Sequence, residues 1–387
     1  METRTDSELG RLLLTERGMQ WLYAQGGDPY ARLLRGEEDD WRGLDDPIRE
    51  RGPLHRSRTG AWVAGSHGLG VEIFRDARLV PRMARGGGVC GAVDLGAVQL
   101  GSAGSEAVGL GVAGAGDVEV WGGEVERLCG RVIDGVGGVF DLVRDVVRPV
   151  LVAVAGEVLG VPGGRRARFA EWCGAVGAAS DAVLCPPVLP RALALGDALG
   201  GLRALVRELE DADDDASVAA GMLVCVVGVE VAVNLAANAV LAVLTDLERS
   251  GSRWPEFGRE PGAAESLVEE TLWRDPPVRL DSRIAREDLE LAGREIAAGD
   301  EVVVHVGAAH RDLPAGRCPL PLADGTYAGD VAPMVRASAA AVLRALPGLR
   351  PAGPVVRRLR APVTRSIVRF PVAVTAAPAK GLAPCAF

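Results

Sequence analysis

The chain of 387 residues has few aromatic side chains and no excess of positive charge. Phe, Trp and Tyr make up 4% of the sequence, and the formal net charge at pH 7 is −9. A nucleic-acid-binding protein needs clustered Lys and Arg side chains that displace counterions from phosphates, and the sequence has no such basic stripe. Short clusters such as Arg165, Arg166 and Arg168 are typical of solvated helix faces. We therefore expect no nucleic-acid partner.

Cysteine is present but does not occur in paired patterns. The seven cysteines are odd in number and form no C-x-x-C pair, so the sequence indicates neither a zinc site nor a disulfide framework. The first ten residues, METRTDSELG, are acidic and have no apolar core, which argues against a secretory signal. We expect a cytoplasmic protein with reduced thiols.

Long hydrophobic runs without polar residues are also missing. The most apolar segment, Met222 to Leu247, is long enough to span a bilayer. However, Glu230, Asn234 and Asn238 interrupt it at helical spacing. The segment is therefore predicted to be a buried central helix of a globular protein, and no membrane partner is expected.

The common catalytic signatures are absent as well. The sequence contains no G-x-S-x-G elbow, no Walker loop and no G-x-G-x-x-G after a predicted strand. Carboxylate pairs such as Asp39-Asp40 and Glu269-Glu270 lie in charged stretches, where solvation explains them. We therefore predict no catalytic residue, no cofactor site and no metal site.

Three segments nevertheless resemble the cytochrome P-450 monooxygenases, beginning with residues 322–336, LADGTYAGDVAPMVR. This segment is similar to the loop that carries the haem-ligating cysteine in that family, roughly FGxGxHxCxGAPLAR. The matching residues are Gly325, Ala332, Pro333 and Arg336. Gly329 stands at the position of the ligating cysteine. Because the thiolate holds the haem iron in that family and glycine has no ligand atom, the resemblance implies a fold without its chemistry.

The second similar segment, residues 268–312, covers the family's Glu-x-x-Arg helix and the sheet after it. Glu270 keeps its place, but Trp273 stands at the arginine position and Arg274 follows one step later. At a spacing of four, Arg274 can still form a surface pair with Glu270 worth about 0.2–0.5 kcal/mol. The resemblance implies that the buried pair supporting the haem loop is lost. Arg283 falls at a haem-propionate position, and we interpret it as a solvated strand-end arginine.

The third similar segment is the predicted central helix, which resembles the family's helix over the oxygen site, roughly AGxETTxNL. Gly228, Glu230, Asn234 and Leu235 match. Val231 replaces the threonine that delivers protons in the family. Valine keeps the outline of threonine but has no hydroxyl. Metal ligand, structural support and proton relay are therefore absent together.

The resemblance covers roughly residues 10–376 and implies a mainly α fold with small β-sheets, cytochrome P-450-like and free of haem. We expect a single domain over residues 1–387, with a helical segment at 1–35 and a flexible glycine-rich segment at 86–118. Two short strands are predicted around the Thr59-Gly60 turn, followed by a helix from about Leu69. Further helices are predicted near 123–160, 164–182 and 190–210.

Two segments point to a particular branch of this family. They are residues 17–34, RGMQWLYAQGGDPYARLL, and residues 353–371, GPVVRRLRAPVTRSIVRFP. Together with the triple loss, they are similar to the P-450-like auxiliary proteins that activate glycosyltransferases in polyketide antibiotic biosynthesis. The resemblance implies a non-catalytic partner of an enzyme that transfers a deoxyaminosugar from its dTDP nucleotide to an anthracycline or macrolide aglycone. A hetero-oligomer is expected.

The N-terminal segment is the predicted partner contact because it combines aromatic side chains with a turn. The candidate residues are Arg17, Trp21, Tyr23, Asp28, Pro29 and Tyr30. Packing of this segment on the rest of the protein is an equally open interpretation. Two other functions are also open: an oxidoreductase with haem or another cofactor held by His305 or His310, and an aglycone-binding protein.

Overall fold

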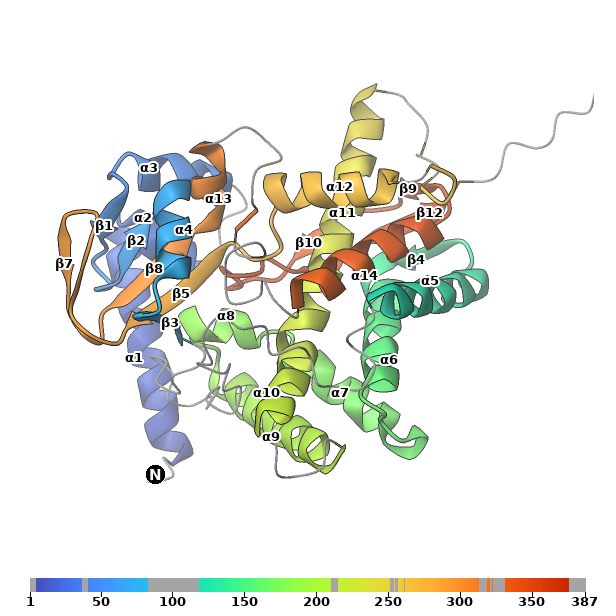
Figure 1. The fold of residues 1–387 in the computed structure, drawn as a ribbon, viewed down its shortest axis with the longest axis horizontal. Helices are drawn as coiled ribbons and strands as arrows, with labels where there is room; N and C mark the ends of the chain where they lie inside the picture. Colours follow the sequence, from blue (N-terminus) through green and yellow to red (C-terminus); the bar gives the residue numbers. More distant parts are fainter. Residues whose placement is uncertain are drawn as a thin grey trace, which may run out of the picture.

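The computed structural model describes residues 5–36, 41–82, 118–209, 215–250, 254, 257–260, 262–312, 319–320, 322 and 331–375. Helices make up most of this part of the chain, and small sheets lie at its edges (Figure 1). The predicted mainly α fold with small sheets is confirmed. The glycine-rich segment 86–118 lies, except for its last residue, outside the described residues.

The α-helices follow one another along the whole chain. They are α1 (Asp6–Gln25), α2 (Pro29–Arg35), α3 (Asp45–Arg49), α4 (His67–Arg75), α5 (Val118–Gly135), α6 (Arg148–Val158), α7 (Arg166–Val176), α8 (Ala179–Leu184), α9 (Leu189–Leu209), α10 (Asp215–Leu223), α11 (Val229–Ser250), α12 (Ala263–Arg274), α13 (Val306–Ala309) and α14 (Val331–Ala345). Short 3-10 helices cover Trp41–Leu44, Gly163–Arg165 and His310–Asp312. Two π-helical segments, Leu142–Val147 and Val224–Gly228, lead into α6 and α11.

A helix of 34 residues, Ser217–Ser250, runs through the middle of the molecule and joins α10 to α11 (Figure 1). Its length and hydropathy would allow it to cross a membrane, but 89% of its most apolar window is buried inside the protein. The prediction of a buried central helix is thus confirmed. Helices α6, α12 and α14 pack on α11, and α14 also packs on α5.

The largest sheet has the strand order β1-β2-β8-β5-β3, in which only β2 and β8 run parallel. Its strands are β1 (Leu54–Arg56), β2 (Trp62–Ala64), β3 (Leu79–Pro81), β5 (Leu280–Ala285) and β8 (Glu301–His305). The predicted pair of strands around Thr59-Gly60 is confirmed. Gly60 has a φ of 94°, a left-handed conformation that favours glycine.

Three smaller sheets complete the described architecture. They contain β4 (Val139–Asp141), β12 (Pro371–Val374) and β9 (Leu349–Pro351) in that order, the hairpin β10 (Val356–Arg357) with β11 (Ile367–Arg369), and the hairpin β6 (Leu289–Leu291) with β7 (Arg294–Ile296). Strand β4 divides the helix predicted at 123–160, which is a correction. Helix α5 ends at Gly135, and Gly138, whose φ is 65°, immediately precedes β4.

The buried apolar side chains form a large cluster among the helices and a smaller one at the five-stranded sheet. Val63 and Val303 of the sheet belong to the helical cluster, whereas Val302 and Val304 face the smaller cluster with Ile73 of α4. The alternation follows from the period of two along a strand. The sheet therefore has apolar contacts on both of its faces.

The turn between α1 and α2 is a buried corner rather than a surface feature. Asp28 is 1% exposed, caps α2 through the backbone N–H of Ala31 at 2.9 Å, and accepts hydrogen bonds from Ser57 Oγ and the Arg58 N–H. Pro29 occupies the first turn of the helix, where its missing N–H costs nothing. Tyr30 is 1% exposed. The side chains of Asp28, Pro29 and Tyr30 are therefore enclosed by the fold in this structure, and their contact with a partner stays a prediction.

We expect Asp28→Ala to destabilise the protein by about 2–4 kcal/mol, because the helix loses its cap and buried donors lose their acceptor. Urea unfolding followed by circular dichroism measures the change. Asp6→Ala, which removes an exposed acid from the first turn of α1, is the control and should cost well under 1 kcal/mol. Equal losses in the two variants would contradict the role of Asp28.

Candidate functional site

The candidate site is bounded by the two helices that carry the family-like motifs, α11 and α14, which pack on each other. Gly329, at the ligand position, lies outside the described residues. Val331 and the rest of α14 after it are described, and so is the whole of α11. The geometry of the site is therefore given by these two helices and by the elements that pack between them.

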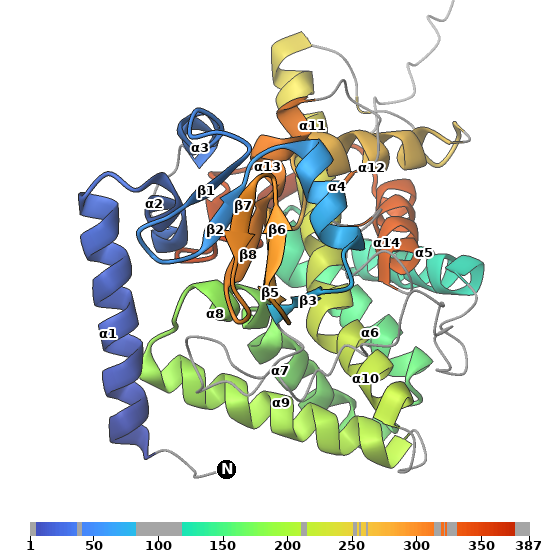
Figure 2. The same ribbon diagram turned by 60° about the vertical axis from the view of Figure 1, so that its left-hand side comes forward.

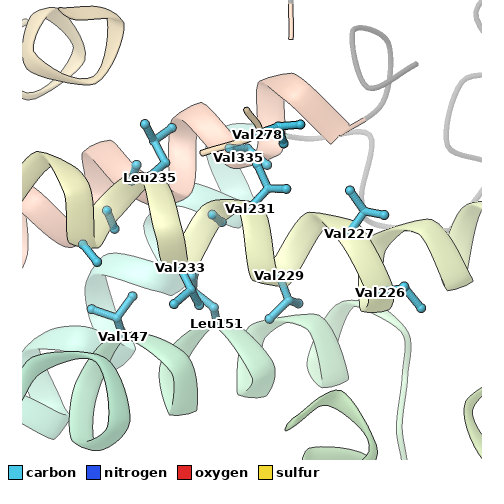
Figure 3. Packing of buried hydrophobic residues seen from close by; sticks show 14 of the residues in the cluster. Val147, Leu151, Val226, Val227, Val229, Val231, Val233, Leu235, Val278 and Val335 are labelled. Carbon is cyan, nitrogen blue, oxygen red and sulfur yellow. The ribbon is translucent and has the colours of Figure 1, made fainter. Parts of the chain in front are cut away.

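Val231 lies on α11 at 1% exposure, inside the helical core. In Figure 3 its side chain lies near those of Val278 and Val335, so the surroundings of the former proton-relay position are aliphatic. A hydroxyl at this place would have to find a hydrogen-bond partner among such neighbours. The buried valine has no such requirement.

Helix α14 packs directly on the central helix at Gly228. A Cβ atom added at Gly228 would lie 2.4 Å from Cε of Met334, closer than Cβ atoms approach other heavy atoms. A haem held as in the monooxygenases has to lie between the ligand loop and the residue at position 231. At Gly228 the space between the two helices does not admit even a methyl group without movement of Met334.

Two further residues of α14 are buried in the same helical core and were not singled out from the sequence. Val331 and Val335 stand where the family motif has glycine and alanine, and both are 0% exposed. Comparison with the family motif could have identified them, because a valine in place of glycine or alanine adds side-chain volume to the buried face of the helix. The residues present therefore do not fit a haem bound in the manner of the family.

The support of the haem loop has been replaced by an aromatic stack. Trp273 is 8% exposed, and its ring stacks on that of His310 with centroids 4.5 Å apart and an interplanar angle of 6°. Arg274 pairs instead with Glu270 at 2.9 Å, with both side chains about half exposed. The predicted surface pair of Glu270 and Arg274 is therefore present. Trp273, at the position of the family's arginine, belongs to the buried aromatic stack.

The two histidines considered as alternative ligands use their ring nitrogens within the fold. His305 accepts a hydrogen bond from the Ala308 N–H at Nδ1, and its Nε2 lies 3.4 Å from Asp45. His310 Nδ1 lies 3.1 Å from the Trp273 carbonyl, and Nε2 accepts from the Leu320 N–H at 3.0 Å. These hydrogen bonds account for both ring nitrogens of His310, so neither histidine offers a free nitrogen to an iron.

Burial keeps both rings neutral. Burial, with a contribution from Arg279, lowers the pKa of His305 to about 3. Burial also lowers the pKa of His310 to about 4. Among the described residues, no group of three or more His, Cys, Asp or Glu side chains is placed to hold a metal ion.

Arg283 is not a solvated strand-end arginine, so that interpretation is wrong. It is 4% exposed, donates to Asp281 at 2.9 Å and lies over the ring of Phe74 at 4.9 Å. Asp281 and Arg283 are two residues apart on β5 and therefore point to the same face. Nε of the guanidinium therefore has a local ionic partner, whereas the buried Nη2 has no hydrogen-bond partner among the described residues.

Glu230 is the centre of a buried polar network on the central helix. It accepts hydrogen bonds from Arg148 of α6 and from Ser366 Oγ, each at 2.7 Å, and Arg358 lies at 3.5 Å. Burial alone would raise the pKa of Glu230, but the two guanidiniums and the Ser366 hydroxyl outweigh it, and the pKa is lowered. The network thus holds a charged carboxylate among the helices.

A second buried carboxyl holds the tip of the β10–β11 hairpin. Asp181 of α8 accepts hydrogen bonds from the Val363 and Thr364 N–H groups at 2.9 Å and from Thr364 Oγ1 at 2.7 Å. Thr364 Oγ1 in turn lies 2.7 Å from Ser366 Oγ, which links the two carboxyls. Burial raises the pKa of Asp181 to about 6, against the opposing influence of Arg358.

The remaining predicted contact residues lie on α1. Trp21 is 53% exposed, whereas Arg17 and Tyr23 are half-buried. Arg17 lies near the buried Cys185, on the side of α1 that faces the body of the protein. The structure therefore separates Trp21 from the other five candidates by its exposure.

Comparison with known proteins gives relatives that extend over nearly the whole chain. Protein AknT of Streptomyces galilaeus is 39% identical over 96% of this chain and 97% of its own. The cytochrome P450 family protein EryCII of Saccharopolyspora erythraea is 32% identical over 96% of this chain and 99% of its own. This chain belongs to the P-450-like glycosyltransferase auxiliary proteins of antibiotic biosynthesis. No family model matches the chain.

The solved structures confirm the fold of this auxiliary protein. Ligand-free CYP164A2 of Mycobacterium smegmatis superimposes with a TM-score of 0.70 at 24% identity, covering 89% of this chain and 99% of that one. The auxiliary protein thus has the architecture of a haem protein, and its helices α11 and α14 are in contact at Gly228.

A double-mutant cycle tests whether α14 fills the former haem space of the auxiliary protein. Met334→Ala should cost about 2–5 kcal/mol of stability through the cavity it leaves. Gly228→Ala requires the flexible end of Met334 to move, so it should cost up to about 1 kcal/mol by overpacking in the wild type and less beside Met334→Ala, where the methyl group has space. The gain in helix propensity cancels in the cycle. Additive losses in urea unfolding would show that the two residues do not share this space.

The buried carboxyl of Asp181 makes the stability of the auxiliary protein depend on pH. Its folded pKa of about 6 lies above the reference value of 3.8, so the folded state binds the proton more tightly. The resulting stabilisation is present at low pH and is lost as the pH rises from about 4 to about 6.

Asp181→Asn keeps an acceptor for the two backbone N–H groups but does not titrate. The stability of this variant minus that of the wild type should therefore rise between pH 4.5 and pH 7, by on the order of 2 kcal/mol. Thermal melts at several pH values measure the difference, and Asp246→Asn, at an exposed position of α11, is the control. A difference independent of pH would contradict the raised pKa.

Proposed function

We propose that this chain binds a glycosyltransferase and activates the transfer of a deoxyaminosugar from a dTDP nucleotide to a polyketide aglycone. The proposal is supported by relatedness over nearly the full length to auxiliary proteins such as AknT and EryCII. It includes a hetero-oligomer of the two proteins and a cytoplasmic location. The aglycone is an anthracycline or a macrolide.

The observation that carries a non-catalytic role is the aliphatic packing around Val231. In the family that the chain resembles, a threonine at this position delivers protons. Here Val231 is buried in the helical core beside Val278 and Val335, and none of the three side chains has a hydroxyl. A protein that keeps the fold but fills the reaction space can act on a reaction only by contact with another molecule.

Activation by contact requires a difference in affinity. If the auxiliary protein binds the competent conformation of the glycosyltransferase more tightly than the incompetent one, it shifts the population toward the former. A tenfold shift requires about 1.4 kcal/mol of differential binding, and a change from 1:99 to 99:1 requires about 5.5 kcal/mol. Both values are within reach of an interface of standard size, about 1,200–2,000 Å².

Co-expression with the glycosyltransferase encoded in the same biosynthetic cluster tests the proposal. We expect the two proteins to co-purify and the rate of sugar transfer to rise at least tenfold over the enzyme alone. Copurification without any gain in rate, or neither effect, would refute activation. Titration calorimetry with the aglycone alone distinguishes an aglycone-binding protein, which would bind it without the enzyme.

An absorption spectrum of the purified chain, after growth with a haem precursor, tests the oxidoreductase alternative. We expect no Soret band, because Met334 occupies the space beside Gly228 and neither ring nitrogen of His310 is free. A stoichiometric Soret band would overturn the non-catalytic assignment.

A further inference from the structure

The exposed large apolar side chains of the described residues are concentrated on α1. Four of the twelve lie on this helix: Leu14, Met19, Trp21 and Leu22. Leu14 is 68% exposed, Trp21 53% and Leu22 54%. Scattered single apolar residues are ordinary on a protein surface, whereas a cluster on one element indicates an interaction site.

Helix α1 lies along one edge of the molecule, as Figure 2 shows at its left side. Its inner face is fixed by the buried Leu9, Leu13 and Ala24, and the Gln20 side chain donates to the Leu184 carbonyl at 2.8 Å. A capping box of Thr5 and Glu8 begins the helix. The helix is therefore well anchored, and its outer face is a rigid surface.

The outer face is apolar and carries no acidic residue. At 100° per residue, seven positions share an arc of about 100° on the side opposite Leu9 and Leu13. They are Ser7, Arg11, Leu14, Gly18, Trp21, Leu22 and Gln25. The acids of this helix, Asp6, Glu8 and Glu16, lie outside this arc. We call the four residues Leu14, Gly18, Trp21 and Leu22 the docking stripe.

Gly18 makes the docking stripe concave at its centre. A Cβ added there would meet nothing within 4 Å, and the bulky Leu14 and Leu22 lie one turn on either side. Glycine in a helix interior lowers stability by about 0.5–1 kcal/mol relative to alanine. No contact within the described part of the chain requires a glycine at position 18. A ridge of side chains from another helix fits such a depression between larger residues.

We propose that the docking stripe binds an apolar helical surface of the glycosyltransferase. The inference rests on the proposed function, which supplies the partner, and it identifies where that partner binds. Depletion of acidic residues beside an exposed Trp21 and Arg11 is the composition of an interface centre, and the exposed Leu14 and Leu22 add apolar area. A second copy of this chain is the less suitable occupant, because each copy has a net charge of −9 and the two repel.

Two variants test the docking stripe without threatening the fold. Gly18→Glu places a charge at its centre, and glutamate forms helices better than glycine. Trp21→Ala removes its largest side chain. The matched control is Gly123→Glu on α5, another exposed helical glycine with nothing within 4 Å of its Cβ position. The readouts are the melting temperature and the Kd for the glycosyltransferase from titration calorimetry or surface plasmon resonance.

We expect both docking-stripe variants to raise the Kd at least about 30-fold, as for residues at the centre of an interface, whereas Gly123→Glu should leave the Kd unchanged. The melting temperatures of Gly18→Glu and Gly123→Glu should be no lower than that of the wild type, because glutamate forms helices better than glycine. Wild-type affinity in all three variants would overturn the docking stripe while leaving the proposed function intact. If the wild-type chain itself neither binds nor activates the enzyme, both proposals fail. If the variants instead abolish self-association in analytical ultracentrifugation but bind the enzyme normally, the docking stripe joins two copies of this chain and the proposal is overturned.

Discussion

The close packing of α14 on the central helix is the constraint on which the rest of this structure depends. A fold that accommodates a haem contains a space of several hundred cubic ångströms, and an empty cavity costs about 24 cal/mol per Å³. The total is on the order of the entire stability of a domain, about 5–15 kcal/mol. Loss of the cofactor therefore has to be accompanied by filling of the space. Val331 and Val335 of α14 are larger than the glycine and alanine of the family motif, both are buried, and Val335 lies beside Val231.

Aliphatic packing alone does not fix the position of the β10–β11 hairpin on the central helix. The polar network around Glu230 fixes this position. A buried carboxylate is costly unless it is paired and hydrogen-bonded. Arg148 comes from α6, whereas Ser366 and Arg358 come from the hairpin region, so satisfying this single charge brings three elements together. Asp181 adds α8 to the same network by capping the backbone at the hairpin tip. The filled space therefore has a polar side that specifies one arrangement of the elements.

Residues whose role depends on local pattern could be predicted from the sequence. The central helix, the strands around Gly60 and the surface pair Glu270–Arg274 follow from helical spacing and turn chemistry. Asp28 and Pro29 also form a local signature, a helix cap followed by proline in the first turn, and this pattern could have identified them as structural. Burial of Tyr30 and Arg283 depends on residues distant in the sequence, so no local pattern shows it. The filling by Val331 was visible only as a departure from the family motif.

A protein with a filled interior can influence another enzyme only through its surface, and the N-terminal corner determines how α1 is presented. The buried Asp28 and Tyr30 join α1 to α2 and the strand turn at Ser57. On its other side, α1 is held to the end of α8 by the hydrogen bond from Gln20. A helix fixed at both places loses little conformational entropy when its outer face binds, and less of the binding free energy is then lost to ordering. Burial of three of the predicted contact residues is thus what makes Trp21 and its exposed neighbours suitable for binding.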